Sequence, residues 1–399
     1  MKKYKHTIFL LLVFSHAMAQ KNELKTLLSK QRLIVIMFDG FGKSYYQNAP
    51  MPFLKTMVQK GLYKEVDALM PTVTNLNNSA ICTGTFAATN GITGNSFLNA
   101  QQEESYMESA SLLLVPTLFQ QLQSQGIASA LLASKKKSIG LLAAGTSIAM
   151  SPEMADSSWI ARLGKPPGIY SAEVNYWTMD AAIDLLKNRQ DIRCLYIHTT
   201  DYPMHMWAPE DSNSINHLKR MDQYIEKLTQ VAPDAMVLIT ADHDVNHKSR
   251  CVDIEKKLAA KGIAIKIAIS AEKDKYPVHH RGFGGTSYVY LKEGQSEATV
   301  KRHLMAIKGV QTVLTKKEAA LQLHLMESRI GDLVVLGDST TVFGSLAKDG
   351  EEALPANYRS HGSAYEIKVP LIIYNAPALP LPYYFQYNKD LTTWLFKLH

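Results

Sequence analysis

The chain has little cysteine and, beyond its first twenty residues, no long hydrophobic run. Its 399 residues include three cysteines, Cys82, Cys194 and Cys251, and no C-x-x-C pair. This excludes a cysteine zinc knuckle and a dense disulfide framework, although one disulfide stays possible. Cys194 lies in an apolar run, which favours a buried thiol there. No stretch after the N-terminal segment is apolar enough to span a bilayer.

Several familiar catalytic motifs are also absent. The sequence contains no G-x-S-x-G and no H-E-x-x-H. Gly42-Lys43-Ser44 resembles a phosphate loop, but Met37 stands where a Walker A motif requires glycine. Charged residues make up 20% of the chain, without a long acidic or low-complexity run, which argues against extensive disorder.

The N-terminus reads as an export signal. A basic start is followed by the apolar run TIFLLLVFS and by Ala17-Met18-Ala19, so we expect residues 1–19 to be a signal peptide, cleaved on export to the periplasm or beyond. The alternative is an N-terminal membrane anchor, but the apolar run falls short of the roughly 20 residues that span a bilayer. Loss of three leader lysines would reduce the net charge from +7 to +4. That suits a small anionic substrate and is too weak and scattered to indicate a nucleic-acid polymer.

Three apolar, β-branched runs each end in residues that can bind a metal. RLIVIMF ends at Asp39, RCLYIHTT at Asp201, and DAMVLIT just before Asp242 and His243. Such runs are typical of buried parallel strands, and helical patterns lie between them. The alternation predicts a doubly wound α/β sheet, in which ligands bind at the carboxyl ends of the strands.

After His243 the pattern changes to helix, strand, strand, helix and further short pieces. We expect residues 247–344 to form an inserted α+β cap domain, with the catalytic core made of residues 20–246 and 345–399. The run VPLIIYN is expected to return to the core sheet.

Six side chains on four separated segments could bind metals. They are Asp39, Asp201, His205, Asp242, His243 and His361. Each has a simpler interpretation alone: a helix cap, the start of a surface helix, a polar loop or a lone histidine. Three carboxylates and three imidazoles at strand ends suit two zinc ions, which can clamp both oxygens of an in-line displacement.

Two further residues are candidates for the chemistry itself. Thr74, in MPTVTNLNN, stands where a hydroxyl nucleophile is expected, and it would also serve as the N-cap of the next helix. Asn95, in GITGNSF, could donate its amide to a phosphoryl oxygen, or could be a left-handed turn residue after Gly94.

Lysines and histidines elsewhere could bind a second anionic group of the substrate. Lys135 and Lys137 belong to a run of three lysines that is otherwise typical of a solvated loop. His279 and His280 could serve the same end from the insertion, or could form a surface turn.

Taken together, these motifs resemble the alkaline phosphatase superfamily, in its phosphodiesterase and nucleotide pyrophosphatase branch. The resemblance rests on the order of strand-DG, PTVTNLN, GITGN, D-x-x-x-H, TADH and a late HG, and covers nearly the whole chain after the leader. Within that branch the chain is similar to phosphonoacetate hydrolase, in segments such as MPTVTNLNNSAICTG, VHHRGFGG and YRSHGSAYEIKVPLIIYN.

The resemblance implies two zinc ions. One would lie on Asp201, His205 and His361, and the other on Asp39, Asp242, His243 and the Thr74 oxygen. It places the nucleophile on Thr74 rather than Thr72, and the two lysines that hold a substrate carboxylate on Lys135 and Lys137. The sequence departs from the family pattern at Asp244, Asn90 and the third lysine.

The sequence therefore predicts an exported two-zinc hydrolase. Thr74 would attack phosphorus, Asn95 and the metals would stabilise the developing charge, and a phosphothreonine would then be hydrolysed to give phosphate and acetate from phosphonoacetate. The alternative is a phosphodiesterase or nucleotide pyrophosphatase with the same machinery, for which Tyr202 and Trp207 are candidates to clamp a base. A catalytically silent binding protein on this fold is disfavoured by the intact nucleophile and ligand set.

Overall fold

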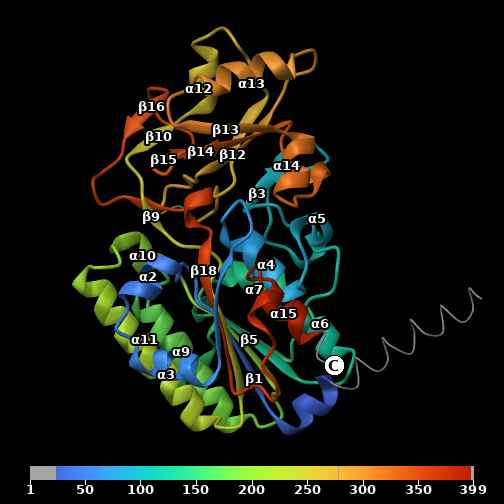
Figure 1. Ribbon diagram of the computed structural model, residues 1–399, viewed down its shortest axis with the longest axis vertical. Coiled ribbons are helices and arrows are strands. Elements are labelled where there is room, and N and C mark those ends of the chain that lie inside the picture. The colour runs from blue at the N-terminus through green and yellow to red at the C-terminus, as the bar shows by residue number, and fades with distance from the viewer. Residues whose placement is uncertain (1–23, 277, 397–399) are drawn as a thin grey trace, which may run out of the picture.

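The computed structural model describes residues 24–276 and 278–396, so the predicted signal peptide lies outside the described residues. A seven-stranded sheet carries helices on both faces, and a second group of smaller sheets lies beyond the carboxyl ends of its parallel strands (Figure 1). The predicted α/β class is therefore confirmed.

The central sheet has the strand order β2-β18-β8-β1-β7-β5-β6. Its strands are β1 (Leu33–Met37), β2 (Leu62–Asp67), β5 (Ser129–Ala133), β6 (Ile148–Met150), β7 (Cys194–His198), β8 (Met236–Thr240) and β18 (Lys368–Tyr374). Strands β6, β5, β7, β1 and β8 run parallel, and β18 pairs antiparallel with both β8 and β2. Every residue of β1, β5, β7 and β8 is buried, as expected of strands covered on both faces.

Helices cover both faces of this sheet (Figure 1). On one face lie α3 (Pro52–Lys60), α9 (Glu173–Asn188) and α11 (Ser212–Val231), and on the other α4 (Thr74–Thr83), α6 (Leu118–Gln123), α7 (Lys136–Leu142) and α15 (Asp390–Leu395). The other helices of the core are α2 (Lys43–Asn48), α5 (Ala87–Asn90), α8 (Ser157–Leu163) and α10 (Tyr202–Met206).

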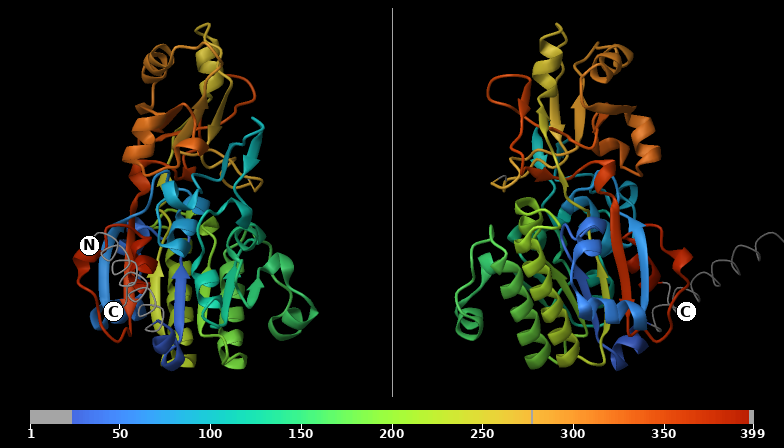
Figure 2. Two further views of the ribbon diagram at one scale, coloured as in Figure 1. Left: turned by 90° about the vertical axis from the view of Figure 1, so that its right-hand side faces the viewer. Right: turned by 60° about the vertical axis from the view of Figure 1, so that its left-hand side comes forward.

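Residues 246–360, called the second region below, lie beyond the carboxyl ends of the parallel strands (Figure 2). Its strands are β9 (Asn246–His247), β10 (Arg250–Val252), β11 (Ile267–Ser270), β12 (Thr286–Tyr290), β13 (Val310–Thr315), β14 (Leu333–Gly337), β15 (Thr341–Phe343), β16 (Glu351–Ala353) and β17 (Arg359–Ser360). Its helices are α12 (Ile254–Ala259), α13 (Glu297–Met305) and α14 (Lys316–Gln322). The hairpin of β3 (Ser96–Leu98) and β4 (Glu104–Tyr106) reaches β11 from the core.

The second region contains a four-stranded antiparallel sheet, β11-β12-β14-β13, and a three-stranded sheet, β15-β10-β16. Strands β9 and β17 pair where the chain enters and leaves it. Strand β16 lies beyond residue 344, and the boundaries of the insertion stay a prediction.

The three cysteines are free and buried, so the disulfide left open by the sequence is not formed. Within the described ranges, no helix is both long and apolar enough for a bilayer crossing.

Candidate active site and metal centre

The register of the central sheet brings the predicted ligands together. Leu33 of β1 lies opposite both Cys194 of β7 and Met236 of β8, so these three parallel strands end level with one another. The loops that follow them open at the same edge of the sheet. Three groups of residues there have ligand atoms within 4.8 Å of one another: Asp39, Asp242 and His243; Asp201, His243 and His361; and Asp201, His205 and His279.

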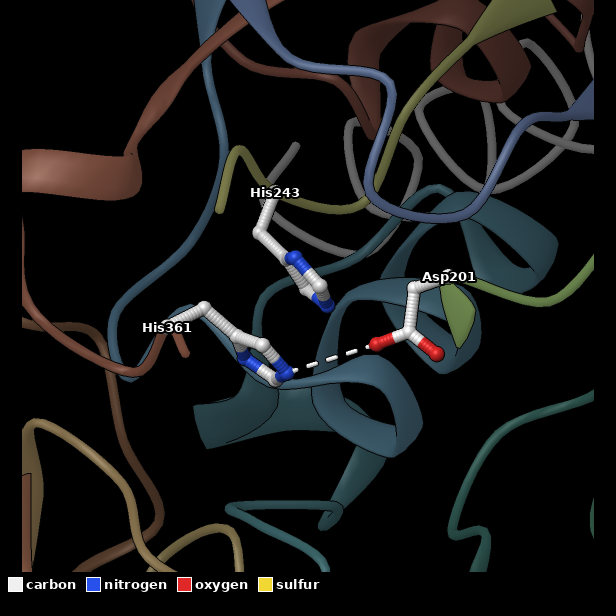
Figure 3. Close-up of side chains that lie close together, drawn as sticks. All are labelled: Asp201, His243 and His361. Carbon is white, nitrogen blue, oxygen red and sulfur yellow. Dashed lines mark ion pairs between the residues drawn. The ribbon is translucent and has the colours of Figure 1, made fainter. Parts of the chain in front are cut away.

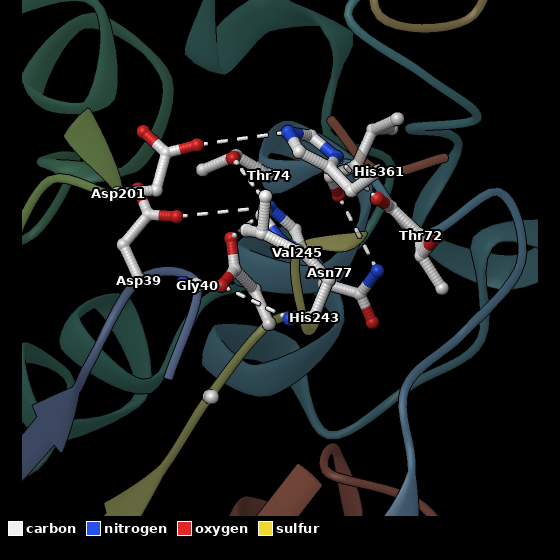
Figure 4. Close-up of polar contacts among 12 residues, drawn as sticks. Asp39, Gly40, Thr72, Thr74, Asn77, Asp201, His243, Val245 and His361 are labelled. Atoms are coloured by element: carbon white, nitrogen blue, oxygen red, sulfur yellow. Dashed lines mark hydrogen bonds and ion pairs between the residues drawn. The ribbon is translucent and has the colours of Figure 1, made fainter. Parts of the chain in front are cut away.

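The first group surrounds the ring of His243. Its Nε2 lies 3.2 Å from Asp242 Oδ2 and 3.7 Å from Asp39 Oδ1. The hydroxyl oxygen of Thr74 lies 3.4 Å from the same nitrogen (Figure 4). The predicted nucleophile is thus next to the imidazole that faces two carboxylates.

Asp201 belongs to both of the other groups. Its Oδ2 lies 2.8 Å from Nε2 of His205, one helical turn along α10, and 3.6 Å from Nε2 of His361 (Figure 3). The rings of His361 and His243 stack with centroids 3.6 Å apart, which joins the two groups into one site. The interpretation of Asp201 and His205 as a surface helix start is wrong, because both are buried.

Three imidazoles are each oriented by a different backbone carbonyl. The Nδ1 atoms of His205, His243 and His361 lie 2.7, 3.1 and 2.7 Å from the carbonyl oxygens of Arg359, Asp244 and Thr72. Each Nδ1 can therefore donate its hydrogen to a carbonyl, which directs Nε2 at carboxylates, and in the neutral rings of His243 and His361 that Nε2 carries a lone pair. A lone pair and a carboxylate repel each other unless a cation lies between them, so this arrangement fits metal binding.

Burial points to the same conclusion. Asp39 Oδ1, Asp242 Oδ2 and His361 Nε2 are buried without a hydrogen-bond partner in the described part of the chain. Burial lowers the pKa of His243 and of His361 to about 4, so both rings are neutral near pH 7 and free to act as ligands. Burial and, after it, the charge of Asp201 raise the pKa of Asp39. The donor set of carboxylate oxygens and neutral imidazoles suits zinc.

Thr74 is the first residue of α4 and not its cap. The N-cap residue is Val73, whose side chain makes no capping hydrogen bond. The N-cap interpretation is therefore wrong, and the hydroxyl is directed instead at His243.

Asn95 is not among the described residues with positive φ, so its interpretation as a left-handed turn residue is also wrong. Its Oδ1 accepts from the backbone N–H of Asn75, next to Thr74, at 3.3 Å. Its Nδ2 lies 3.4 Å from the carbonyl of Glu272. The Asn95 side chain therefore lies between the start of α4 and the second region.

Lys135 and Lys137 are buried, with relative exposures of 6% and 7%, so the solvated-loop interpretation is wrong for both. Lys137 forms a close ion pair with Asp274. Burial by itself lowers the pKa of Lys137, but the nearby carboxylates, Asp274 above all, together outweigh this effect, so the pKa is raised. Lys135 Nζ lies 3.8 Å from Asp201 Oδ1, and within residues 24–276 and 278–396 this is its one ion pair. Lys135 therefore keeps free donors beside the candidate metal ligands.

His279 and His280 lie in a turn, as one interpretation of the sequence predicted, but both imidazoles are buried and not directed to solvent. His279 Nε2 lies 3.8 Å from Asp201 Oδ1. His280 Nε2 lies 3.6 Å from Glu272 Oε1, and its Nδ1 accepts from the backbone N–H of Gly282.

Sequence reasoning missed three charged or polar residues at the site. Glu272 follows β11 closely and lies 3.6 Å from His361 Nε2 through its Oε1, and burial raises its pKa. Asp274 neutralises Lys137. His198, the last residue of β7, lies 3.2 Å from Asp39 Oδ2. A polar residue at a strand end was the available signal for His198 and Glu272.

Comparison with known proteins gives one family match. The model of the family described as type I phosphodiesterase / nucleotide pyrophosphatase matches residues 33–364. Among curated proteins, the chain is 23% identical to human bis(5'-adenosyl)-triphosphatase ENPP4 over 231 residues, covering 55% of this chain and 48% of that protein. The bovine protein of the same name is 28% identical over 102 residues, covering 25% and 22%. The chain thus spans about half, or less, of the length of these relatives.

Solved structures give a more extensive match. Phosphonoacetate hydrolase from Sinorhizobium meliloti, in complex with phosphonoacetate or phosphonoformate, is 28% identical, with a TM-score of 0.82 over 92% of this chain and 96% of that one. Murine ectonucleotide pyrophosphatase / phosphodiesterase 5 is 15% identical, with a TM-score of 0.69 over 92% of this chain and 96% of that one. This similarity shows only that the two proteins share a fold.

Proposed function

The chain belongs to the type I phosphodiesterase / nucleotide pyrophosphatase family of the alkaline phosphatase superfamily, and we propose that it hydrolyses the C–P bond of phosphonoacetate to phosphate and acetate. Family membership and structural similarity support phosphoryl hydrolase activity. The choice of phosphonoacetate rests on one observation, the buried ammonium of Lys135 with free donors beside the metal ligands.

Two zinc ions would be held as the resemblance implies, one by Asp39, Asp242, His243 and Thr74, and the other by Asp201, His205 and His361. The clustering of Asp39 with Asp242 and His243 supports the first set, and the distances of His205 and His361 from Asp201 support the second. When bound, such ions act as Lewis acids that favour the alkoxide of a nearby hydroxyl and neutralise phosphoryl oxygens.

Thr74 is the proposed nucleophile. Its oxygen attacks phosphorus in line, the C–P bond breaks, and the electron pair leaves with the two-carbon fragment, which takes up a proton to become acetate. Water then cleaves the phosphothreonine ester, which releases phosphate and restores the hydroxyl. The position of Thr74, 3.4 Å from His243 Nε2, supports this role.

Asn95 is proposed to stabilise charge on the phosphoryl oxygens. Its Oδ1 accepts from the backbone N–H of Asn75 at the start of α4, which holds the side chain next to the proposed nucleophile Thr74. One amide hydrogen of Asn95 faces the Glu272 carbonyl at 3.4 Å, which leaves the other for the substrate.

The substrate carboxylate is proposed to bind Lys135, with Lys137, His279 and His280 around it. Lys137 is paired with Asp274, so its contribution is the position it gives α7 and a partly neutralised charge. Burial strengthens the attraction of the Lys135 ammonium for a carboxylate, because little water screens the pair.

Phosphodiester or nucleotide hydrolysis is the second candidate. Tyr202 and Tyr170 lie 5.8 and 5.6 Å from the ring of His279, measured between centroids, and offer aromatic faces for a nucleobase. Trp207, the other aromatic candidate, follows α10.

Phosphate release from phosphonoacetate, and nitrophenol release from a nitrophenyl phosphodiester, test the two candidates side by side on the zinc-loaded protein without residues 1–19. Turnover of phosphonoacetate alone supports the first, and turnover of the diester alone supports the second. Turnover of neither overturns both proposals. Export is a separate proposal, tested by the N-terminal residue and compartment of the protein expressed in a Gram-negative cell: an intact Met1 in the cytoplasm contradicts it.

A further inference from the structure

His279 has the features of a metal ligand in a place where the family resemblance assigns none. Its side chain is 1% exposed. Both ring nitrogens are buried and have no hydrogen-bond partner in the described part of the chain. An imidazole without any partner is costly to bury, so the position requires an explanation.

The ring faces the Asp201 group. The ligand atoms of Asp201, His205 and His279 all lie within 4.8 Å of one another. His279 packs edge-on against His205, with centroids 4.7 Å apart and an angle of 72° between the rings. Its distance of 3.8 Å from Asp201 Oδ1 is too long for a hydrogen bond. It is, however, a separation that two ligands of one ion can have, because each lies about 2 Å from the ion.

The neighbouring histidine makes a useful contrast. His280 Nδ1 accepts from the backbone N–H of Gly282 at 3.0 Å, and its Nε2 faces Glu272. His280 is therefore accounted for by the turn in which it lies, whereas His279 is not.

We propose that His279 is a fourth protein ligand of the metal held by Asp201, His205 and His361. The second region then contributes a ligand of its own to a centre otherwise built on the core. A zinc ion with three protein ligands keeps a position open for substrate, and one with four is closed. In such a centre, His279 would fill the fourth position. This inference concerns metal binding and holds for either substrate.

The test uses the full mature chain loaded with Co²⁺, in wild type and in the variants His279→Gln, His279→Cys and His280→Gln. Chelator competition measures the affinity of each bound equivalent, and absorption spectra report the coordination of Co²⁺. We expect His279→Gln to weaken one equivalent by at least about 10-fold, since even indirect partners of a ligand contribute that much. His280→Gln should leave both equivalents unchanged.

His279→Cys gives a positive readout at the same position. A thiolate bound to Co²⁺ produces a charge-transfer band in the near ultraviolet. We expect the wild type to lack this band, because none of its three cysteines belongs to a group of candidate metal ligands. Thermal unfolding of each variant verifies that it folds. Unchanged affinity in His279→Gln, an equal loss in His280→Gln, or no new band in His279→Cys would each overturn the proposal. Because no turnover is measured, failure here leaves the proposed hydrolase function intact.

Discussion

The edge of the seven-stranded sheet and the second region meet at the candidate site, and they contribute different groups to it. From the sheet edge come Asp39, Asp201 and Asp242, each on a loop that directly follows a buried strand. From the second region come Glu272 and His279, on the segment between β11 and β12. The sheet edge carries the candidate carboxylate ligands beside Thr74, the proposed nucleophile, whereas the second region places Glu272 and His279 against them.

The two regions are connected to the site differently. At the sheet edge, continuous backbone pairing aligns strands β1, β7 and β8, which fixes where the loops that follow them begin. The second region reaches the site through a longer connection and through ion pairs such as Lys137 with Asp274. The proposed nucleophile and Lys135, the residue proposed to bind the substrate carboxylate, both belong to the core, and the second region adds Glu272 and His279 around them.

The largest effect is expected from Thr74→Ala. Removal of the hydroxyl should lower kcat by about 10⁴-fold or more, because no other group takes over a covalent step. Asp39, Asp242 and His243 remain, so metal content should not change. Phosphate release and metal analysis measure the two quantities, and Thr74→Ser is the matched control that keeps a hydroxyl. Undiminished turnover in Thr74→Ala would refute the nucleophile and the role given to the core.

The junction of the two regions provides the next test. Lys248 Nζ lies 2.8 Å from Oε1 of Glu366, which belongs to a short 3₁₀ helix (Ala364–Glu366), and both side chains are fully buried. Lys248→Met should lower the free energy of unfolding by about 3–5 kcal/mol, because a buried carboxylate is left unpaired. Urea unfolding measures the loss.

Glu366→Gln combined with Lys248→Met should restore much of that stability. Glutamine still accepts from Ser363, whose backbone N–H and hydroxyl bond Glu366 Oε2, but carries no charge. A double variant as unstable as Lys248→Met would show that the pair is not what connects the regions.

The two lysines separate binding from positioning. Lys135→Met should raise KM for phosphonoacetate by about 10–100-fold, since a hydrogen bond between charged groups contributes about 1.5–3 kcal/mol. Its KM for a nitrophenyl diester should change little, because that substrate has no carboxylate. Lys137→Met should instead mainly lower stability, because Asp274 loses its partner. Equal KM effects in both variants would contradict the asymmetry.

The smallest expected effect concerns the core alone. Burial lowers the pKa of His217 to about 3, and its Nδ1 meets the hydroxyl of Tyr176 at 2.9 Å. The unfolded chain, with a histidine pKa near 6.5, binds more protons between about pH 6.5 and pH 3, so stability from His217 is complete above pH 6.5 and is lost as pH falls.

His217→Gln should flatten this dependence by about 1 kcal/mol per pH unit. Urea unfolding at pH 7 and pH 5, in wild type and variant, measures it. A wild-type stability with the same slope as the variant would contradict the assignment. A single transition at both pH values would show that the core and the second region unfold together.

Local pattern was enough to predict the fold class and to place the carboxylates. Buried β-branched runs that end in Asp39, Asp201 and Asp242 identify parallel strands, and parallel strands bring their ends to one edge. The contact between Asp201 and His205 could also be predicted from their helical spacing, because the two residues are close in the sequence. Roles in catalysis and binding stay predictions for all of these residues.

The tertiary structure alone decided what surrounds them. A run of three lysines looks solvated in the sequence, but α7 begins at Lys136, and its position buries Lys135 and Lys137 while Lys136 faces water. Glu272 and His279 meet the core ligands only because the second region packs over the sheet edge, through contacts between residues 70 or more positions apart. Periodicity reports which face of an element is buried. It carries no information on which distant element covers that face, because that choice depends on packing of the whole chain.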